Sequence, residues 1–257
     1  MMRWMQSVAV LAAIVSAAGT ARAQEIAQAE QIGGSGPVQI NPTLSYVLFR
    51  LAQKSEMRFL RIPTQAERAK QEANRAFELV RAQSKNPDLT EAEFQLPPLE
   101  LYNFINTTMG PVFDKQDGQY LYLIAVRPVS YVIYGHMWLS GPGDAETCFC
   151  LGTVQFDARA GQVVDIGRIR LNDDWDGTPL PPNPAGNRPF ALIPPGPGIV
   201  PPGDRLQGVT ITPARFHATG KMPNYFGALI DRLPPIPGVL DYDRGTVIDV
   251  ASGHRLP

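Results

Sequence analysis

Two cysteines separated by a single residue have the most distinctive chemistry in this sequence. Cys148 and Cys150 are the two cysteines of the chain, and residues two apart on a β-strand point to the same face. By the alternation of the strand that follows, this is the face of Val154 and Phe156, which we assign to the core. We therefore expect two buried thiols that behave as small apolar residues. The alternatives are a redox-active disulfide, or a copper(I) or zinc site with His136 as the nearest further ligand.

A short acidic segment has the spacing of a calcium-binding loop. Asn172, Asp174 and Asp176 alternate with other residues, and Gly177 follows them. This matches the first half of such a loop. However, the first ligand should be Asp, and the twelfth position, which should be Glu, is Asn183. We expect a solvated acidic loop here, with a calcium site as the alternative, and we expect no cofactor.

Nucleophilic catalysis has little support in the sequence. There is no Gly-x-Ser-x-Gly elbow and no His-Glu-x-x-His motif. The three histidines are His136, His217 and His254, and His254 falls in a C-terminal tail. Any triad would use His136 or His217 with a serine that the sequence does not identify. A catalytic role therefore stays undecided, and we favour a protein that is not an enzyme.

Aromatic side chains near His136 are the best candidates for a ligand-binding face. Tyr134 and Trp138 flank this histidine at a spacing of two residues, and Tyr and Trp serve both cores and carbohydrate or peptide surfaces. We name Trp138, Tyr134 and His136 as the candidate ligand-binding residues, with Trp138 the most exposed.

The N-terminus has the order of a secretory signal peptide. Arg3 precedes an apolar run over residues 8–18, and Ala21-Arg22-Ala23 provides a small-residue cleavage site before Gln24. The run is shorter than the roughly 20 residues that span a bilayer. We expect a periplasmic or secreted protein with no transmembrane segment after cleavage.

Charge and composition restrict the function further. The chain has 23 Lys and Arg against 24 Asp and Glu and contains no basic block, so we expect no binding to nucleic acid, which needs a positive face. The 25 prolines and 23 glycines predict many turns and few long helices.

The chemistry-bearing residues fall on or between predicted strands. Runs at residues 46–51 and 57–62 predict one strand pair, and runs at 120–126 and 131–136 predict another. The 120–126 strand is apolar on both faces, so it should be covered on both sides. Residues 148–157 and 163–171 predict a third pair around Ala160-Gly161, and 209–212 and 245–250 predict late strands. We expect one or two helical turns at 225–233.

One helix is predicted over about residues 65–83. Thr64 and Glu67 have the spacing of a capping box, and Asn86-Pro87 should end the helix. Small and apolar residues recur at helical spacing on one face, which predicts a helix that packs this stripe on a sheet. The stripe consists of Ala66, Ala69, Ala73, Phe77 and Val80.

These elements predict a mainly β protein with an antiparallel β-sandwich, one inserted surface helix and a proline-rich loop excursion. Ten prolines lie between residues 177 and 204, and this stretch cannot form the interior of a sheet. The expected organisation is a signal peptide (1–23), a flexible leader (24–38), the sandwich (39–172), a Pro/Gly-rich connection (173–205), C-terminal strands of the same domain (206–250) and a tail (251–257).

Part of this sandwich resembles a known type of module. The strands at residues 120–126 and 131–135, followed by the hairpin-like stretch 152–167, resemble a module of uncharacterised bacterial exported proteins and lipoproteins. The resemblance covers about residues 119–171. It implies a small β-sandwich and gives no activity, and the lipidated cysteine of the lipoprotein members is missing.

Three functions remain open on the sequence. We favour an exported, non-enzymatic protein with a binding or structural role at the envelope, whose partner is an unknown envelope protein or polymer. The alternatives are a periplasmic hydrolase whose site is assembled in three dimensions, and a thiol or copper-binding protein that uses Cys148 and Cys150. A cleft where His136 or His217 meets a serine or a carboxylate would favour the hydrolase, whereas an aromatic face or an open sheet edge would favour binding.

Overall fold

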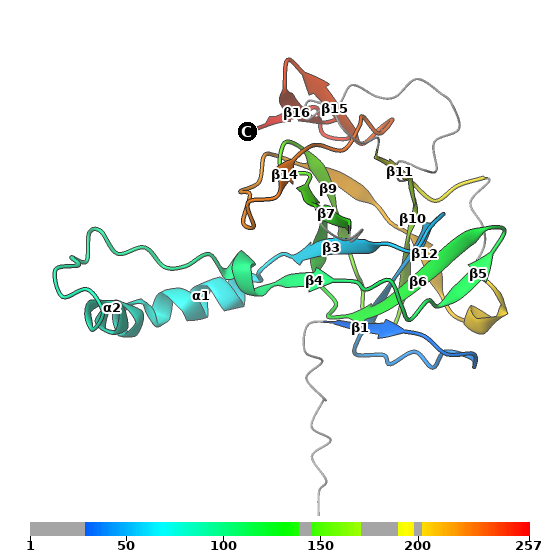
Figure 1. Ribbon diagram of the computed structural model, residues 1–257, viewed down its shortest axis with the longest axis horizontal. Helices are drawn as coiled ribbons and strands as arrows, with labels where there is room; N and C mark the ends of the chain where they lie inside the picture. Colours follow the sequence, from blue (N-terminus) through cyan, green and yellow to red (C-terminus); the bar gives the residue numbers. More distant parts are fainter. Residues whose placement is uncertain (1–28, 139–144, 171–189, 198–201) are drawn as a thin grey trace, which may run out of the picture.

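The computed structural model describes residues 29–138, 145–170, 190–197 and 202–257, and it is mainly β (Figure 1). The predicted β-sandwich is confirmed: two large sheets pack face to face, and a third, three-stranded sheet lies at one end of the body. Most strand pairs are antiparallel, while β2–β10, β10–β12 and β8–β14 are parallel.

The first sheet has the strand order β1-β6-β2-β10-β11, with β5 paired to β6 and β12 paired to β10. Its strands are β1 (Ala29–Ile32), β2 (Ser45–Leu51), β5 (Asp114–Gln116), β6 (Gln119–Val126), β10 (Val163–Arg170), β11 (Ala191–Ile193) and β12 (Ile211–Pro213).

The second sheet has the order β13-β9-β7-β3-β4, with β8 paired to β7 and β14 paired to β8. Its strands are β3 (Glu56–Arg61), β4 (Phe104–Asn106), β7 (Ser130–Trp138), β8 (Ala145–Cys148), β9 (Thr153–Asp157), β13 (Phe216–Thr219) and β14 (Leu229–Ile230). The third sheet contains β15 (Leu240–Asp243), β16 (Thr246–Asp249) and β17 (His254–Leu256), and 3-10 turns are formed by η1 (Leu99–Tyr102) and η3 (Asp204–Leu206).

The three predicted strand pairs are wrong, although the strands themselves are present. The chain passes from the first sheet to the second between β2 and β3 and between β6 and β7, and it returns between β9 and β10. Turn residues show where a chain changes direction, but they do not show whether the next strand pairs with the last one or crosses the core. Here the consecutive strands face each other across the core, and each finds its hydrogen-bonded neighbours elsewhere in the sequence.

The main core lies between the two large sheets and is continuous with the C-terminal sheet. Strand β6 alternates as predicted and is buried on both faces: Tyr122 and Ile124 belong to the inter-sheet core, whereas Leu121 and Leu123 lie in a second cluster on the outer face of the first sheet. Residues 32–44 and the turn at Leu206 cover that second cluster.

The predicted helix forms but does not cover a sheet. It is divided into α1 (Gln65–Ala73) and α2 (Arg75–Gln83) at Asn74, and the capping box of Thr64 and Glu67 is present. None of the residues that the structure describes in either helix is buried, and Phe77 and Val80 are 69% and 66% exposed. The prediction that the apolar stripe packs on a sheet is therefore wrong.

The helices instead belong to an arm, defined here as residues 64–98, which projects from the sandwich (Figure 1). Strands β3 and β4 pair with each other, with Leu60 opposite Phe104, so the arm is a long insertion in a β-hairpin. Its return segment is held to the helices by polar contacts: Gln71 donates to the Pro97 carbonyl and Arg75 to the Phe94 carbonyl.

Several segments at the ends of the domain are more ordered than expected. Strand β1 lies within the predicted flexible leader and pairs with β6, and β17 lies within the predicted tail and pairs with β16. Residues 225–233 form no helix and contribute β14 instead. In the proline-rich connection, β11 pairs with β10 at the edge of the first sheet, while residues 171–189 and 198–201 lie outside the described residues. No helix in the described part of the chain is long and apolar enough to cross a membrane.

Candidate functional site

A basic groove lies where the chain crosses between the two large sheets. It encloses about 410 Å³ and is lined by Asp157, Arg159, Gln162, Val164, Thr212, Pro213, Arg215 and His217. These residues come from two stretches, the β9–β10 connection with its flanking strands and the β12–β13 segment. We call this set of residues the basic groove.

Strand pairing brings these two stretches together. Thr212 of β12 lies opposite Val164 of β10 in the first sheet, and His217 of β13 lies opposite Gln155 of β9 in the second. Both connections therefore cross between the sheets side by side. Val164 is a buried member of the inter-sheet core, so the groove has an apolar floor and polar walls.

The charge in the groove is mainly positive. Arg159, Arg215 and His217 are exposed, and over the described ranges the guanidinium groups of Arg159 and Arg215 form neither an ion pair nor a hydrogen bond. The acidic member, Asp157, accepts a hydrogen bond of 2.6 Å from the Ser130 hydroxyl. Two guanidinium groups thus remain available to a ligand. A guanidinium group can donate two parallel hydrogen bonds, which suits carboxylates and phosphates.

A second carboxylate, that of Asp249, lies close enough to His217 for the two groups to interact electrostatically. Asp249 of β16 accepts hydrogen bonds from the Ser252 hydroxyl and the Ala218 backbone N–H. The pKa of Asp249 is lowered, first by the Ser252 hydrogen bond and also by the N–H of Ala218 and the charge of His217. Strand β13, which carries His217, is therefore in contact with the third sheet through Ala218 and Asp249.

His136 meets a serine inside the sandwich. The hydroxyl of Ser55, in the β2–β3 connection, lies 2.6 Å from Nε2 of His136, and both residues are buried. An irregularity in the β3–β7 register, where Arg58 pairs with Gly135 but Phe59 with Ile133, leaves Tyr134 as an extra residue. This bulge re-aims the side chains of β7, and it places His136 beside Met57 and Phe190, on the inter-sheet side.

The same bulge separates the predicted ligand-binding residues. Tyr134 points to the outer face of the second sheet, where its ring packs against Phe104 with centroids 4.7 Å apart. Its hydroxyl donates to the Pro223 carbonyl and accepts from the Tyr225 N–H, and burial raises its pKa. Tyr134 and His136 therefore do not share a site, and the Trp138 side chain lies outside the described residues.

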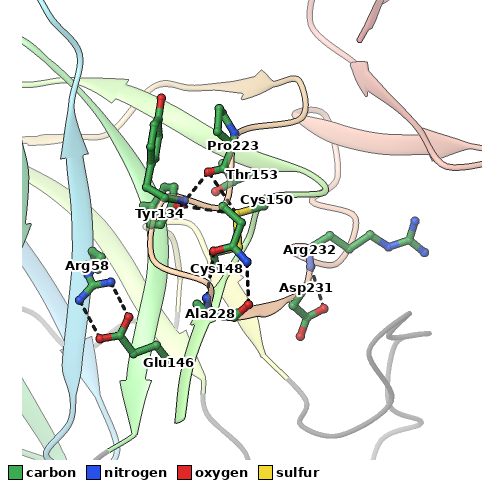
Figure 2. Close-up of a disulfide and its surroundings, with 12 residues drawn as sticks. Arg58, Tyr134, Glu146, Cys148, Cys150, Thr153, Pro223, Ala228, Asp231 and Arg232 are labelled. Atoms are coloured by element: carbon green, nitrogen blue, oxygen red, sulfur yellow. Dashed lines mark hydrogen bonds and ion pairs between the residues drawn. A yellow bond between two sulfur atoms is a disulfide. The ribbon is translucent and has the colours of Figure 1, made fainter. Parts of the chain in front are cut away.

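The two cysteines form a disulfide, so the expected pair of free thiols is wrong (Figure 2). Both are buried, as predicted, but on the outer side of the second sheet with Tyr134 rather than with Val154 and Phe156. The reason is a turn after Cys148: β8 ends there and β9 begins at Thr153, so the alternation of one strand does not continue into the other.

The metal-binding alternatives find no donor set in the described residues. No group of three or more His, Cys, Asp and Glu side chains converges in that part of the chain, and the sulfur atoms of Cys148 and Cys150 are bonded to each other. The calcium-loop candidates Asn172, Asp174 and Asp176 lie outside the described residues.

Comparisons of the chain with protein-family models, with curated proteins and with solved structures found no match. The class of protein is thus defined by fold and site: a β-sandwich with a basic groove and a projecting arm. The sequence identified His217 only as a possible triad histidine, and the other groove residues were missed because they come from segments about 50 residues apart and share no motif.

Proposed function

We propose that this is an exported, non-enzymatic binding protein that holds its ligand in the basic groove. The observation that carries the proposal is the groove itself: about 410 Å³ with polar walls and an apolar floor, within the size range of small-molecule sites. The wall residues project from connections anchored in paired strands, so the site is preformed rather than assembled on binding. Export is supported by the order of charged, apolar and small residues in the first 23 positions.

Nuclear magnetic resonance on the mature protein, residues 24–257, tests the binding site. We expect fragments of envelope polymers, screened as neutral and charged oligosaccharides and short peptides, to shift the amide signals of Arg159, Gln162 and Thr212 in a saturable manner. Thr212→Trp, which fills the groove, should abolish these shifts. Thr90→Trp, at an exposed position on the arm, is the matched control and should leave them in place.

Two results would overturn the proposal. One is a screen in which no compound shifts the groove signals, and the other is saturable binding whose shifts survive Thr212→Trp. Export is tested separately by N-terminal sequencing of the protein recovered from the periplasm, where we expect the mature chain to begin at Gln24.

The contact between Ser55 and His136 supports one second candidate, a hydrolase. A serine hydroxyl within hydrogen-bonding distance of an imidazole is the arrangement of an activated nucleophile, and the 2.6 Å separation meets that requirement. The burial of both side chains argues for a structural hydrogen bond instead. A fluorophosphonate probe that labels the protein at Ser55, and fails to label Ser55→Ala, would establish the hydrolase and remove the non-enzymatic proposal.

A further inference from the structure

We infer that the ligand of the basic groove is an oxyanion, that is, a molecule that presents a carboxylate or a phosphate to Arg159 and Arg215. This inference rests on the proposed function and specifies the chemical class of the ligand. It depends on the charges that line the groove, on which of them are already paired, and on the position of the apolar floor.

The two arginines of the groove differ from several arginines elsewhere in the sandwich. Arg50 pairs with Asp165, Arg58 with Glu146 and Arg61 with Glu67, and none of these carboxylates lines the groove. Arg159 and Arg215 lack such partners in the described ranges, although Asp157 lines the same groove. Two unpaired guanidinium groups in one groove favour the binding of an anion over that of a cation.

Asp157 is the one carboxylate among the described residues that line the groove. One of its carboxylate oxygens is engaged by the Ser130 hydroxyl across the β7–β9 pair, in which Ser130 lies opposite Asp157. The carboxylate is thus held toward β7, and the Coulomb attraction that it exerts on the two arginines is weakened by water at this exposed position. The sum of the formal charges on Asp157, Arg159 and Arg215 remains positive.

Three further groove residues add hydrogen-bond donors to the two arginines. Gln162, Thr212 and His217 supply an amide, a hydroxyl and an imidazole, each of which carries a hydrogen-bond donor. They line the same hollow as the guanidinium groups, above the buried Val164. An oxyanion on a ring with an apolar C–H face, such as a sugar, would place its charged group on the wall of the groove and its C–H face on the floor.

Matched ligand pairs test the inference. Galacturonate against galactose, and glucose 6-phosphate against glucose, differ in the oxyanion and share a ring. We expect each charged compound to bind the groove at least about tenfold more tightly than its neutral partner in low salt. The preference should decrease as the salt concentration rises, because exposed charges are screened. The two pairs distinguish a carboxylate ligand from a phosphate ligand.

Charge-removing variants provide the second readout. Arg159→Gln and Arg215→Gln should each weaken binding of the charged ligand by roughly three- to tenfold, since each removes one guanidinium group, and each should weaken binding of the neutral partner by a smaller factor. Arg81→Gln, a change of equal charge at an exposed position on the arm, is the matched control and should have no effect on either compound.

The possible failures separate the two proposals. Neutral and charged sugars that shift the groove signals equally would overturn the oxyanion inference and leave the binding function intact. Charged ligands whose affinity is unchanged in the Arg159→Gln/Arg215→Gln double variant would also overturn it. The absence of any groove shift with either member of both pairs would count against the inference, and the wider screen described above then decides the binding function.

Discussion

Glu67 is one of the residues that join the arm to the sandwich. Its carboxylate accepts two hydrogen bonds from the guanidinium of Arg61, of 2.8 and 2.9 Å, and one from the Thr64 backbone N–H. These contacts lower its pKa from the usual 4.5 to about 2, with the Arg61 hydrogen bond as the largest cause. One carboxylate thus completes the helix cap and pairs with the last residue of β3.

The lowered pKa of Glu67 makes a prediction about stability and pH. A carboxyl group with a lower pKa in the folded state contributes stability that is complete above its unfolded pKa, near 4.5, and that is lost as the pH falls through about 2. Glu67→Gln keeps a cap residue and removes the charge. In urea unfolding we expect this variant to be less stable than the wild-type protein at pH 7, with a difference that shrinks between pH 4.5 and pH 2. A difference that is constant over this range would show that the charge of Glu67 is not what stabilises the contact.

At the residue level, the sequence identified individual side chains of interest but not the distant residues that they contact. Thr64 and Glu67 were predictable because a capping box is a local pattern of four residues. Ser55 and His136 are 81 positions apart, and the bulge at Tyr134 that aims the histidine depends on a register between β3 and β7 that no local pattern records. The outward position of the disulfide was missed for the same reason, since one turn inverted the assumed alternation.

At the level of elements, hydrophobic periodicity correctly predicted that a helix forms. It did not predict which surface, if any, the helix packs against. The spacing that places Ala69, Ala73, Phe77 and Val80 on one face is real, yet this face is exposed to solvent. Strand existence was likewise predictable from β-branched and aromatic runs, whereas the pairing of β2 with β10, over 100 residues away, was not. Pairing is decided by which partner closes the core, and this is a property of the whole chain.

Two phenylalanines test this description of the helix. Phe77 is 69% exposed on α2, whereas Phe59 of β3 is 1% exposed in the inter-sheet core. We expect Phe77→Ala to change the free energy of unfolding by less than about 0.5 kcal/mol and Phe59→Ala to lower it by roughly 3–5 kcal/mol. Chemical denaturation measures both. A loss of more than about 2 kcal/mol in Phe77→Ala would mean that the arm folds back on the body in solution.

At the level of the whole molecule, one core unites the sheets and excludes the arm. Residues from β2 to β16 contribute to the inter-sheet cluster, among them Phe49, Phe156, Phe216 and Val247. The arm begins and ends beside the same strand pair, where the Arg61 N–H donates to the Asn103 carbonyl over 3.0 Å. The strand pairing and the core of the sandwich are therefore complete without side chains from the arm.

Excision of the arm tests this independence. Replacement of residues 65–98 by a short Gly-Ser linker should leave a protein that unfolds in one cooperative transition, with a melting temperature within a few degrees of the full chain. Ligand binding in the basic groove should be unchanged, because no arm residue lines it. Calorimetry and the groove titration measure the two outcomes. An excised protein that aggregates or melts in several steps would show that the arm supports the body.

The position of the basic groove has a mechanical consequence. Its walls are two of the chain segments that cross from one layer of the sandwich to the other, so a ligand bound there would contact both layers at once. The two sheets could then separate only after the ligand had dissociated. The free energy of unfolding should therefore increase with the logarithm of the ligand concentration once this exceeds the dissociation constant. The contact between the two layers would be most stable where the ligand is abundant.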